Sequence, residues 1–525
     1  MKTFKNIIKK AKTVFAFTAV MLVGSSCDNF LDVNTNPNLT LDNPPELILP
    51  SVEAMIGFSM GSDVTRYTLL FSQQMSAQNG RQTENFDLYI IQPTEVNGLF
   101  RTNLYAGALA DIEKILVKPA NTIHPHYIGI SKILKAFTYS VLTDLFGDVP
   151  FTEAIQGESN GNYAPKLDGS QAIYTNCVRL IDEGIAEMRK TSPLRAVGND
   201  DYIYRGNAAR WIKFANTLKL RLLLHTLNLP NADRNAVVSF VTNTPATEFM
   251  EAVADNFQLS YEATARRQNP VHQFITDRTD DLCTSSTIID MMNAKADPRR
   301  SVYFTPAPFS PALLTTPPTG NTGYVGLRNG TGAGGVRNNL SRLHTYVRGA
   351  QTSLAATAAG PTLGVTAIGY NGTAPTRMLT FAEYNFIRAE LALRYGAPGN
   401  AQEFYANGIR ASFADAGLPA TAATAYLATP SGTLEGTPTD QLREIMEEKY
   451  IANFMVALEP WNDWKRTGFP LLTLLTGINN VGNNGRVPRV LPYPQQEVDA
   501  NPNMQQRANM STNPVFWDVR TTGQQ

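Results

Sequence analysis

The stretch YIGISKILKAFTYSVLTDLFGDVP, residues 127–150, carries the clearest structural signal in this chain of 525 residues. Its apolar residues recur at spacings of three and four, which places them on one face of a helix. The pattern stops at Gly147 and Pro150, which are typical helix-ending residues. A second amphipathic stretch, residues 99–116, comes shortly before it. The sequence therefore predicts two helices joined by a short connection.

Paired helical patterns recur along the chain. Predicted helical hairpins lie at about 97–146, 170–228, 381–416 and 440–468. Short hairpins that cannot bury both faces alone are the building units of stacked helical repeats, of which tetratricopeptide repeats are a common kind. The spacing is irregular and the standard consensus is not met. We therefore predict a mostly α fold, with degenerate tetratricopeptide-like helical hairpins as its scaffold.

The region between the second and third hairpins, about 296–380, differs in character. It is rich in Pro, Gly and Asn, which predicts long loops with short strands, and such loops are typical of binding surfaces. No acidic residue lies between Arg299 and Ala382, whereas the same stretch contains seven Arg. The loop-rich half is therefore predicted to bind the ligand, with a local positive bias.

The N-terminus reads as an export signal. Residues 1–26 combine a basic start, an apolar stretch and small residues, and Cys27 follows directly. That order predicts a lipoprotein signal peptide with acylation of Cys27. An ordinary secretory signal is the alternative, because Gly24 stands where Leu is usual. Residues 27–44, polar and rich in Asn and Pro, predict an extended tether, and residues 45–525 a single soluble domain without a membrane span.

Composition narrows the function further. Without the five Lys of residues 1–26, 40 basic residues face 45 acidic ones, a net charge of −5. This argues against a nucleic-acid partner, which needs a strong basic excess. After Cys27 only Cys177 and Cys283 remain, so no disulfide framework is predicted. Cys177 fits a helix core, Cys283 is either buried or free, and neither is assigned a role.

Three short motifs offer chemistry, and each lacks its structural context. GFSMG, residues 57–61, spells a serine nucleophile elbow, but a helix rather than a strand is predicted before Ser59. GTGAGG, residues 330–335, lacks the strand, helix and acidic residue of a dinucleotide site. His124 and His126 have no further ligand at a recognisable spacing. No enzyme activity, cofactor or metal is therefore predicted.

Four motifs together resemble the SusD/RagB family, the surface lipoproteins of Bacteroidetes that partner TonB-dependent transporters. They are CDNFLDVNTNPN (27–38), RW followed by ANTLKLR (210–221), EEKY followed by EPWNDWKRTG (447–468), and RVLPYPQQEVDANPN (489–503). They sample both ends and the middle of the chain. The resemblance therefore covers essentially the whole sequence after the signal.

This resemblance implies a lipid-anchored protein of the outer membrane, exposed at the cell surface, that caps a SusC-like TonB-dependent transporter and delivers glycan to it without catalysis. A peptide or another anionic nutrient is the alternative ligand. A surface glycan hydrolase and a structural assembly protein are alternative functions. The shared motifs are framework and do not name the ligand.

Aromatic and polar side chains in loops are the predicted ligand contacts, because aromatic planes stack on the C–H faces of sugars. The candidates are Phe86, Tyr89, Tyr303, Phe304, Tyr324, Arg328 and Tyr346.

Overall fold

Helix α6 (Pro125–Phe146) forms from the stretch that dominates the sequence pattern. In the computed structural model, residues 43–525 are described except 280, 311, 333–338, 355–367 and 521–525. The His124 side chain accepts a hydrogen bond from the backbone N of His126 at the start of α6, and Pro125 occupies the first turn. Gly147 ends the helix with φ at 72°, a conformation that favours glycine.

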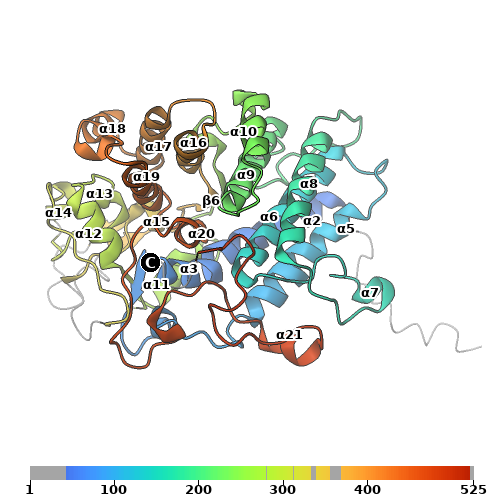
Figure 1. Cartoon of the computed structure of the whole chain (residues 1–525), viewed down its shortest axis with the longest axis horizontal. Coiled ribbons are helices and arrows are strands. Elements are labelled where there is room, and N and C mark those ends of the chain that lie inside the picture. Colours follow the sequence, from blue (N-terminus) through green and yellow to red (C-terminus); the bar gives the residue numbers. More distant parts are fainter. Residues whose placement is uncertain (1–42, 280, 311, 333–338, 355–367, 521–525) are drawn as a thin grey trace, which may run out of the picture. The chain divides into compact units, whose positions relative to one another are not determined.

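Helices dominate the described residues (Figure 1). The α-helices are α2 (Pro45–Ser59), α3 (Thr65–Phe71), α4 (Glu84–Asp87), α5 (Ala110–Leu116), α6, α7 (Gly157–Asn160), α8 (Ser170–Met188), α9 (Ala208–Thr226), α10 (Arg234–Asn243), α11 (Pro270–Asp277), α12 (Ser286–Ala294), α13 (Arg300–Tyr303), α14 (Ala312–Thr315), α15 (Thr345–Arg348), α16 (Phe381–Tyr395), α17 (Ala401–Asp415), α18 (Ala420–Leu427), α19 (Pro438–Ala452), α20 (Glu459–Thr467) and α21 (Gln495–Ala500).

Six short strands form three antiparallel pairs in the described part of the chain. The strands are β1 (Met75–Ala77), β2 (Phe257–Leu259), β3 (Leu282–Thr284), β4 (Gln351–Leu354), β5 (Ile368–Tyr370) and β6 (Thr376–Leu379), paired as β1 with β3, β2 with β6 and β4 with β5. Two segments are π-helical, η1 (Met60–Val64) and η2 (Gly98–Leu109). The mostly α fold with tetratricopeptide-like hairpins is therefore confirmed.

Helices α6 and α8 pack most extensively of all, and two glycines set their separation. A Cβ on Gly129 would lie 2.9 Å from the carbonyl oxygen of Gly184, and a Cβ on Gly184 would lie 2.9 Å from that of Gly129. The two backbones therefore meet without side chains between them.

The helical pairing differs in detail from the expected hairpins. Helix α6 packs more on α8 than on α5, and α19 packs more on α16 than on α20. Figure 1 shows α16, α17 and α19 side by side, with α9 and α10 next to α16. Each hairpin therefore buries its second face against helices from other hairpins, as expected for repeats that cannot stand alone.

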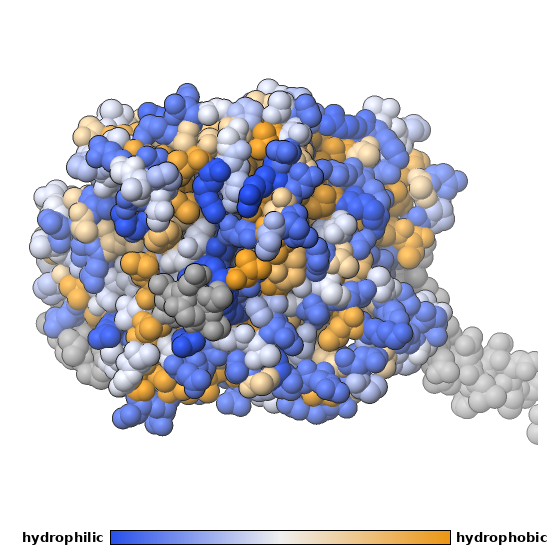
Figure 2. Space-filling view, viewed as in Figure 1, coloured by the Kyte–Doolittle hydropathy of each residue, from blue (hydrophilic) through white to orange (hydrophobic). Residues whose placement is uncertain are grey.

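Helix α2 continues through η1 into α3. By length and composition, the span Pro45–Phe71 is long and apolar enough to cross a membrane. The expectation of no such stretch after Cys27 is corrected in that respect. However, 56% of the most apolar 18-residue stretch of this span is buried inside the fold, as in a core helix of a soluble protein. On the face shown in Figure 2, hydrophilic and hydrophobic residues are interspersed.

Residues Pro45–Gln525 cluster as one compact unit. The predicted signal peptide, 1–26, and the lipidation site Cys27 lie outside the described residues. So does the predicted tether, 27–44, apart from its last two residues.

Candidate functional site

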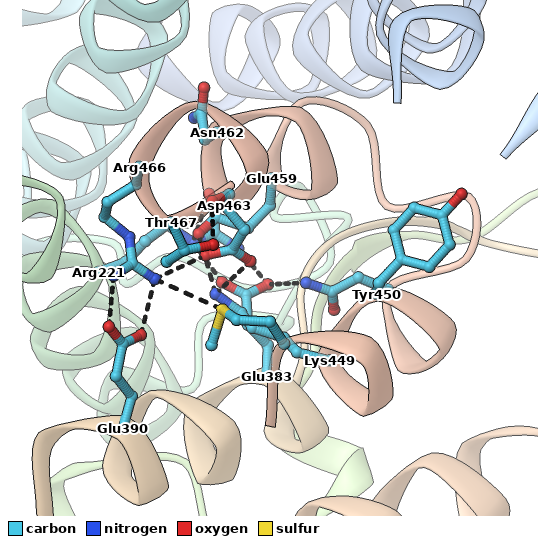
Figure 3. A network of polar contacts seen from close by, with 12 residues as sticks. Arg221, Glu383, Glu390, Lys449, Tyr450, Glu459, Asn462, Asp463, Arg466 and Thr467 are labelled. Atoms are coloured by element: carbon cyan, nitrogen blue, oxygen red, sulfur yellow. Dashed lines mark hydrogen bonds and ion pairs between the residues drawn. The ribbon is translucent and has the colours of Figure 1, made fainter. Parts of the chain in front are cut away.

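Helix α20 is highly charged and yet buried. Glu459, Asp463 and Arg466 are only 1%, 4% and 2% exposed. The Glu459 carboxylate accepts a hydrogen bond from Lys449 Nζ at 3.2 Å and lies 3.2 Å from His225 Nε2. Burial alone would raise the pKa of Glu459, but the surrounding positive groups, Lys449 foremost, hold it well below its usual range. The helix therefore sits inside a compensated network of charges (Figure 3).

The network extends across the scaffold through arginine forks. Arg466 donates to Glu390 through Nη1 at 2.5 Å and Nη2 at 2.7 Å. Arg221 donates to Glu383 through Nε at 2.6 Å and Nη2 at 2.7 Å. These bonds join α20 to α16, and α9 to α16. Since the charges are buried and paired with one another, this cluster holds the framework together and offers no opening to a ligand.

A second buried cluster fixes the start of the loop-rich region. Arg299 Nη2 donates to Asp297 Oδ2 at 2.6 Å and to Glu448 Oε2 at 2.7 Å, while its Nη1 donates to Ser412 Oγ at 3.0 Å. Its guanidinium also lies 5.0 Å from the centroid of the Phe413 ring. The loop-rich region is thereby fastened to α17 and α19.

Most other arginines of residues 299–382, the stretch without acidic residues, also form contacts inside the protein. Arg377 Nε lies 2.7 Å from Asp415 Oδ2, and Arg348 lies over the Tyr370 ring at 4.4 Å. Arg299, Arg300, Arg342, Arg348 and Arg377 are all at most 9% exposed, and Arg337 lies outside the described residues. Among the described arginines of this stretch, Arg328 is the exposed one. Most of the positive charge of this stretch is therefore buried.

Six of the seven predicted ligand contacts are core residues. Phe86, Tyr89, Tyr303, Phe304, Tyr324 and Tyr346 are between 0% and 6% exposed. Their faces are occupied by other core groups: the Tyr303 ring, for example, lies 5.0 Å from that of Phe454 and 4.5 Å from that of Tyr346. These six rings offer no exposed face to a sugar in this structure, which corrects their expected role to packing. Arg328 is exposed and remains a candidate.

Arg328 belongs to a polar surface built from two loops. We call this surface the loop face and define it by its exposed residues Asn79, Arg81, Gln82, Arg328 and Thr331. The two loops touch closely, because a Cβ on Gly332 would overlap the Asn79 side chain. Amide, hydroxyl and guanidinium groups here can donate to and accept from ligand hydroxyls.

Asp87 holds the loop face together from beneath. Its buried carboxylate accepts from the backbone N of Ala77 at 3.2 Å, from the backbone N of Gly330 at 2.8 Å and from Asn329 Nδ2 at 2.5 Å. Burial raises the pKa of Asp87 to about 6, although these hydrogen bonds act in the opposite direction. No sequence spacing signals this contact, because Asp87 and Asn329 are 242 residues apart.

The catalytic motifs do not assemble in the described residues. Ser59 is buried within the helical span, and its Oγ donates to Met55 O at 2.7 Å, so it is not a nucleophile on a strand-to-helix turn. Residues 43–525, outside the gaps, contain no group of three His, Cys, Asp or Glu that could hold a metal. Cys177 and Cys283 are both buried, and burial raises the pKa of the Cys177 thiol far above its ordinary value.

A family model described as SusD-like, starch-binding associating with outer membrane, matches residues 38–494. The chain belongs to the SusD-like family. Its recognition from the sequence motifs is thereby confirmed, and the buried network of α20 contains residues of one of those motifs. Comparison with curated proteins gave no match to this SusD-like chain.

Solved structures share the SusD-like fold. A chitin-binding SusD homologue from Flavobacterium johnsoniae has a TM-score of 0.70 and 22% identity, covering 91% of this chain and 98% of the other. A further chitin-binding protein has a TM-score of 0.72 and 23% identity, covering 91% and 100%. A SusD homologue from Bacteroides fragilis has a TM-score of 0.69 and 22% identity, covering 87% and 94%. At these identities the likeness shows the fold of the SusD-like protein and not its ligand.

Proposed function

We propose that this SusD-like protein is a non-catalytic surface lipoprotein that binds oligosaccharide and delivers it to a partner TonB-dependent transporter in the outer membrane. The observation that carries the proposal is the family match over residues 38–494, whose description names starch binding and outer-membrane association. The chitin-binding relatives of the same fold support a glycan ligand. The signal-like residues 1–26, followed by Cys27, support lipid anchoring.

The loop face is the proposed glycan site. Its Asn79, Arg328 and Thr331 are exposed and carry hydrogen-bonding groups. Asp87 and Asn329 hold the two loops in place, which limits the conformational entropy lost on binding. Glycan rings are rich in hydroxyls, and the loop face presents amide and hydroxyl groups beside two exposed guanidinium groups, those of Arg81 and Arg328, all of which can bond to hydroxyls.

The alternatives find less support. The arginine bias that suggested an anionic nutrient or a peptide lies mostly in internal contacts, such as Arg299 with Glu448 and Arg377 with Asp415. A hydrolase needs a positioned nucleophile or a pair of carboxylates facing a cleft, and Ser59 does not meet that need. Neutral glycan is therefore the favoured ligand, and binding without turnover is the favoured activity.

Calorimetry with variants of the loop face tests this site. The purified protein is titrated with oligosaccharides of the starch and chitin types, and Asn79→Ala and Arg328→Ala are compared with Arg179→Ala, an exposed arginine on α8. Each loop-face variant lacks one hydrogen-bonding side-chain group, so we expect it to bind the glycan about 2- to 10-fold more weakly. Arg179→Ala should bind like the unmodified protein. Equal affinity in all three variants would rule out the loop face as the site.

Membrane fractionation tests the anchor and the partner. The protein expressed with its own signal should fractionate with the outer membrane and co-purify with a TonB-dependent transporter. A Cys27→Ser variant should lose acylation and appear in the soluble fraction. Unchanged membrane attachment of Cys27→Ser would contradict the lipid anchor.

A further inference from the structure

A pocket of about 190 Å³ lies between the π-helical turn η1 and helix α11. Phe58, Ser62 and Arg66 line it from the α2–η1–α3 helix, and Gln273 and Phe274 line it from α11. No residue of the loop face lines it. Single π-turns inside α-helices are frequent at functional sites, because the wider turn displaces the side chains that follow it.

The walls of the pocket combine an aromatic plane with polar groups. Phe58 is 49% exposed, so part of its ring is open to a molecule in the pocket. The Ser62 Oγ is shielded from solvent and has no hydrogen-bond partner. A shielded hydroxyl without a partner is unfavourable, and rotation of the Ser62 side chain into the pocket would let a ligand hydroxyl provide the missing partner.

Arg66 is the charged residue among those that line the pocket, and its charge is paired. Arg66 forms an ion pair with Asp63 and lies 5.1 Å from the centroid of the Phe274 ring. Arg278 lies 5.6 Å from the same centroid and follows the exposed Asp277. The guanidinium of Arg66 is thus paired with Asp63, and the other residues that line the pocket are uncharged, so no net charge selects an anion. Phe274 is engaged by the two guanidinium groups, whereas Phe58 remains available to stack.

The volume limits the ligand to one ring. A cavity of about 150 Å³ holds one benzene-sized molecule, whereas sites for larger ligands run from about 300 Å³ upward. The pocket therefore admits a single six-membered ring, and any further rings of a glycan chain would lie outside it. Leu282, which also lines the pocket, pairs in register with Ala77, two residues before Asn79. The β1–β3 pair thus joins this pocket to the loop face.

We propose that this pocket binds one neutral pyranose residue, free or at the end of a glycan chain, with its C–H face on Phe58 and a hydroxyl on Ser62 Oγ. Aromatic planes and sugar C–H faces are complementary in this way. The proposal deepens the glycan-binding function above and rests on it. It adds a second subsite, at the η1 turn, to the one proposed at the loop face.

Ligand-observed NMR with methyl pyranosides tests the pocket. Saturation transfer from the full-length protein to methyl glucoside and to methyl N-acetylglucosaminide is compared among Phe58→Ala, Phe58→Tyr and Leu47→Ala. Leu47 is 66% exposed on the same helix and does not line the pocket, so it is the matched control. We expect Phe58→Ala to weaken binding at least 10-fold, while Phe58→Tyr and Leu47→Ala retain it. Thermal unfolding confirms that each variant is folded.

Three results would contradict the proposed binding of a pyranose in this pocket. Unchanged pyranoside binding by Phe58→Ala is the first. Preferential binding of N-acetylphenylalanine amide over the pyranosides is the second, since it would assign the pocket to a peptide side chain. The third is binding of oligosaccharides alone, sensitive to Arg328→Ala, without any pyranoside signal. That third result would leave the proposed glycan-binding function intact. Failure of every saccharide to bind would contradict both the pyranose pocket and the glycan-binding function.

Discussion

Arg466 and Glu390 form a buried, two-pronged ion pair between α20 and α16, and both side chains are 0% exposed. Burial alone would raise the pKa of Glu390, but Arg466, with help from Arg394, outweighs it and lowers the pKa to about 2. The pair is therefore ionised across the whole physiological range. It fixes a helix made largely of charged and aromatic residues inside the protein.

Breaking this pair should be costly. Glu390→Gln leaves the Arg466 guanidinium buried beside an uncharged amide, and we expect the free energy of unfolding to fall by about 3–5 kcal/mol. Glu262→Gln is the control, because Glu262 pairs with Arg267 at the surface and should change stability by less than about 1 kcal/mol. Urea denaturation of both variants measures the difference. Equal midpoints would show that the buried pair does not stabilise the fold.

Acidification should weaken the loop-rich region through two histidines. Burial, with a contribution from Arg348, lowers the pKa of both His272 and His344 to about 4. The unfolded chain binds these protons near pH 6.5, whereas the native state does not until about pH 4. These histidines therefore leave the free energy of unfolding unchanged above pH 6.5 and lower it progressively as the pH falls toward 4.

A double variant, His272→Gln with His344→Gln, isolates this effect. Asp87 works in the opposite direction, because its raised pKa of about 6 makes the native state take up a proton first as pH falls. The difference in unfolding free energy between the parent and the double variant cancels that contribution. We expect this difference to shrink from pH 7 to pH 4. A difference independent of pH would contradict the assignment.

Because α6 and α8 approach closely, the loss of stability caused by a glycine-to-alanine change should depend strongly on which glycine is replaced. Gly129→Ala places a methyl group 2.9 Å from the Gly184 carbonyl oxygen, so the helices must separate, and we expect a loss of about 1–3 kcal/mol in stability. Gly98→Ala meets nothing within 4 Å and should be neutral or slightly stabilising. Thermal midpoints compare the two. Similar midpoints would mean that the helices are free to adjust.

Removing the Asp87 carboxylate should loosen the loop face. In Asp87→Ala, the amides of Ala77 and Gly330 lose their acceptor, so their hydrogen exchange should accelerate while exchange in α6 and α8 stays slow. Mass spectrometry of peptides covering residues 75–89 and 327–332 measures this. Unaltered exchange in both peptides would show that other contacts hold the loops.

Local periodicity explains what was predictable from the sequence. The helix at residues 127–146 follows from its own apolar spacing and its end at Gly147, and both are features of neighbouring residues. Helix α20 shows the limit. Its charged sequence resembles a surface helix, yet it is buried because Arg221, Glu390 and Lys449 meet it from other helices.

The candidate site was less predictable for the same reason. Tyr303 and Tyr346 lie in a segment rich in loop residues, and no local pattern shows that Phe454, far along the chain, covers Tyr303. The acidic partner of Arg377 is Asp415, which lies beyond the acid-free stretch. Burial of polar and aromatic groups in irregular segments depends on such distant contacts, and a single sequence does not display them.

We propose that the protein binds glycan and leaves it intact. Its most direct test is to incubate the purified protein with starch- and chitin-type oligosaccharides, measure binding by equilibrium dialysis, and analyse the recovered sugar by chromatography after prolonged incubation. We predict saturable binding of at least one glycan, with every recovered chain at its original length. Absence of binding to both glycan types would show that the protein is not a receptor for these glycans, and shortened products would show that it is a hydrolase.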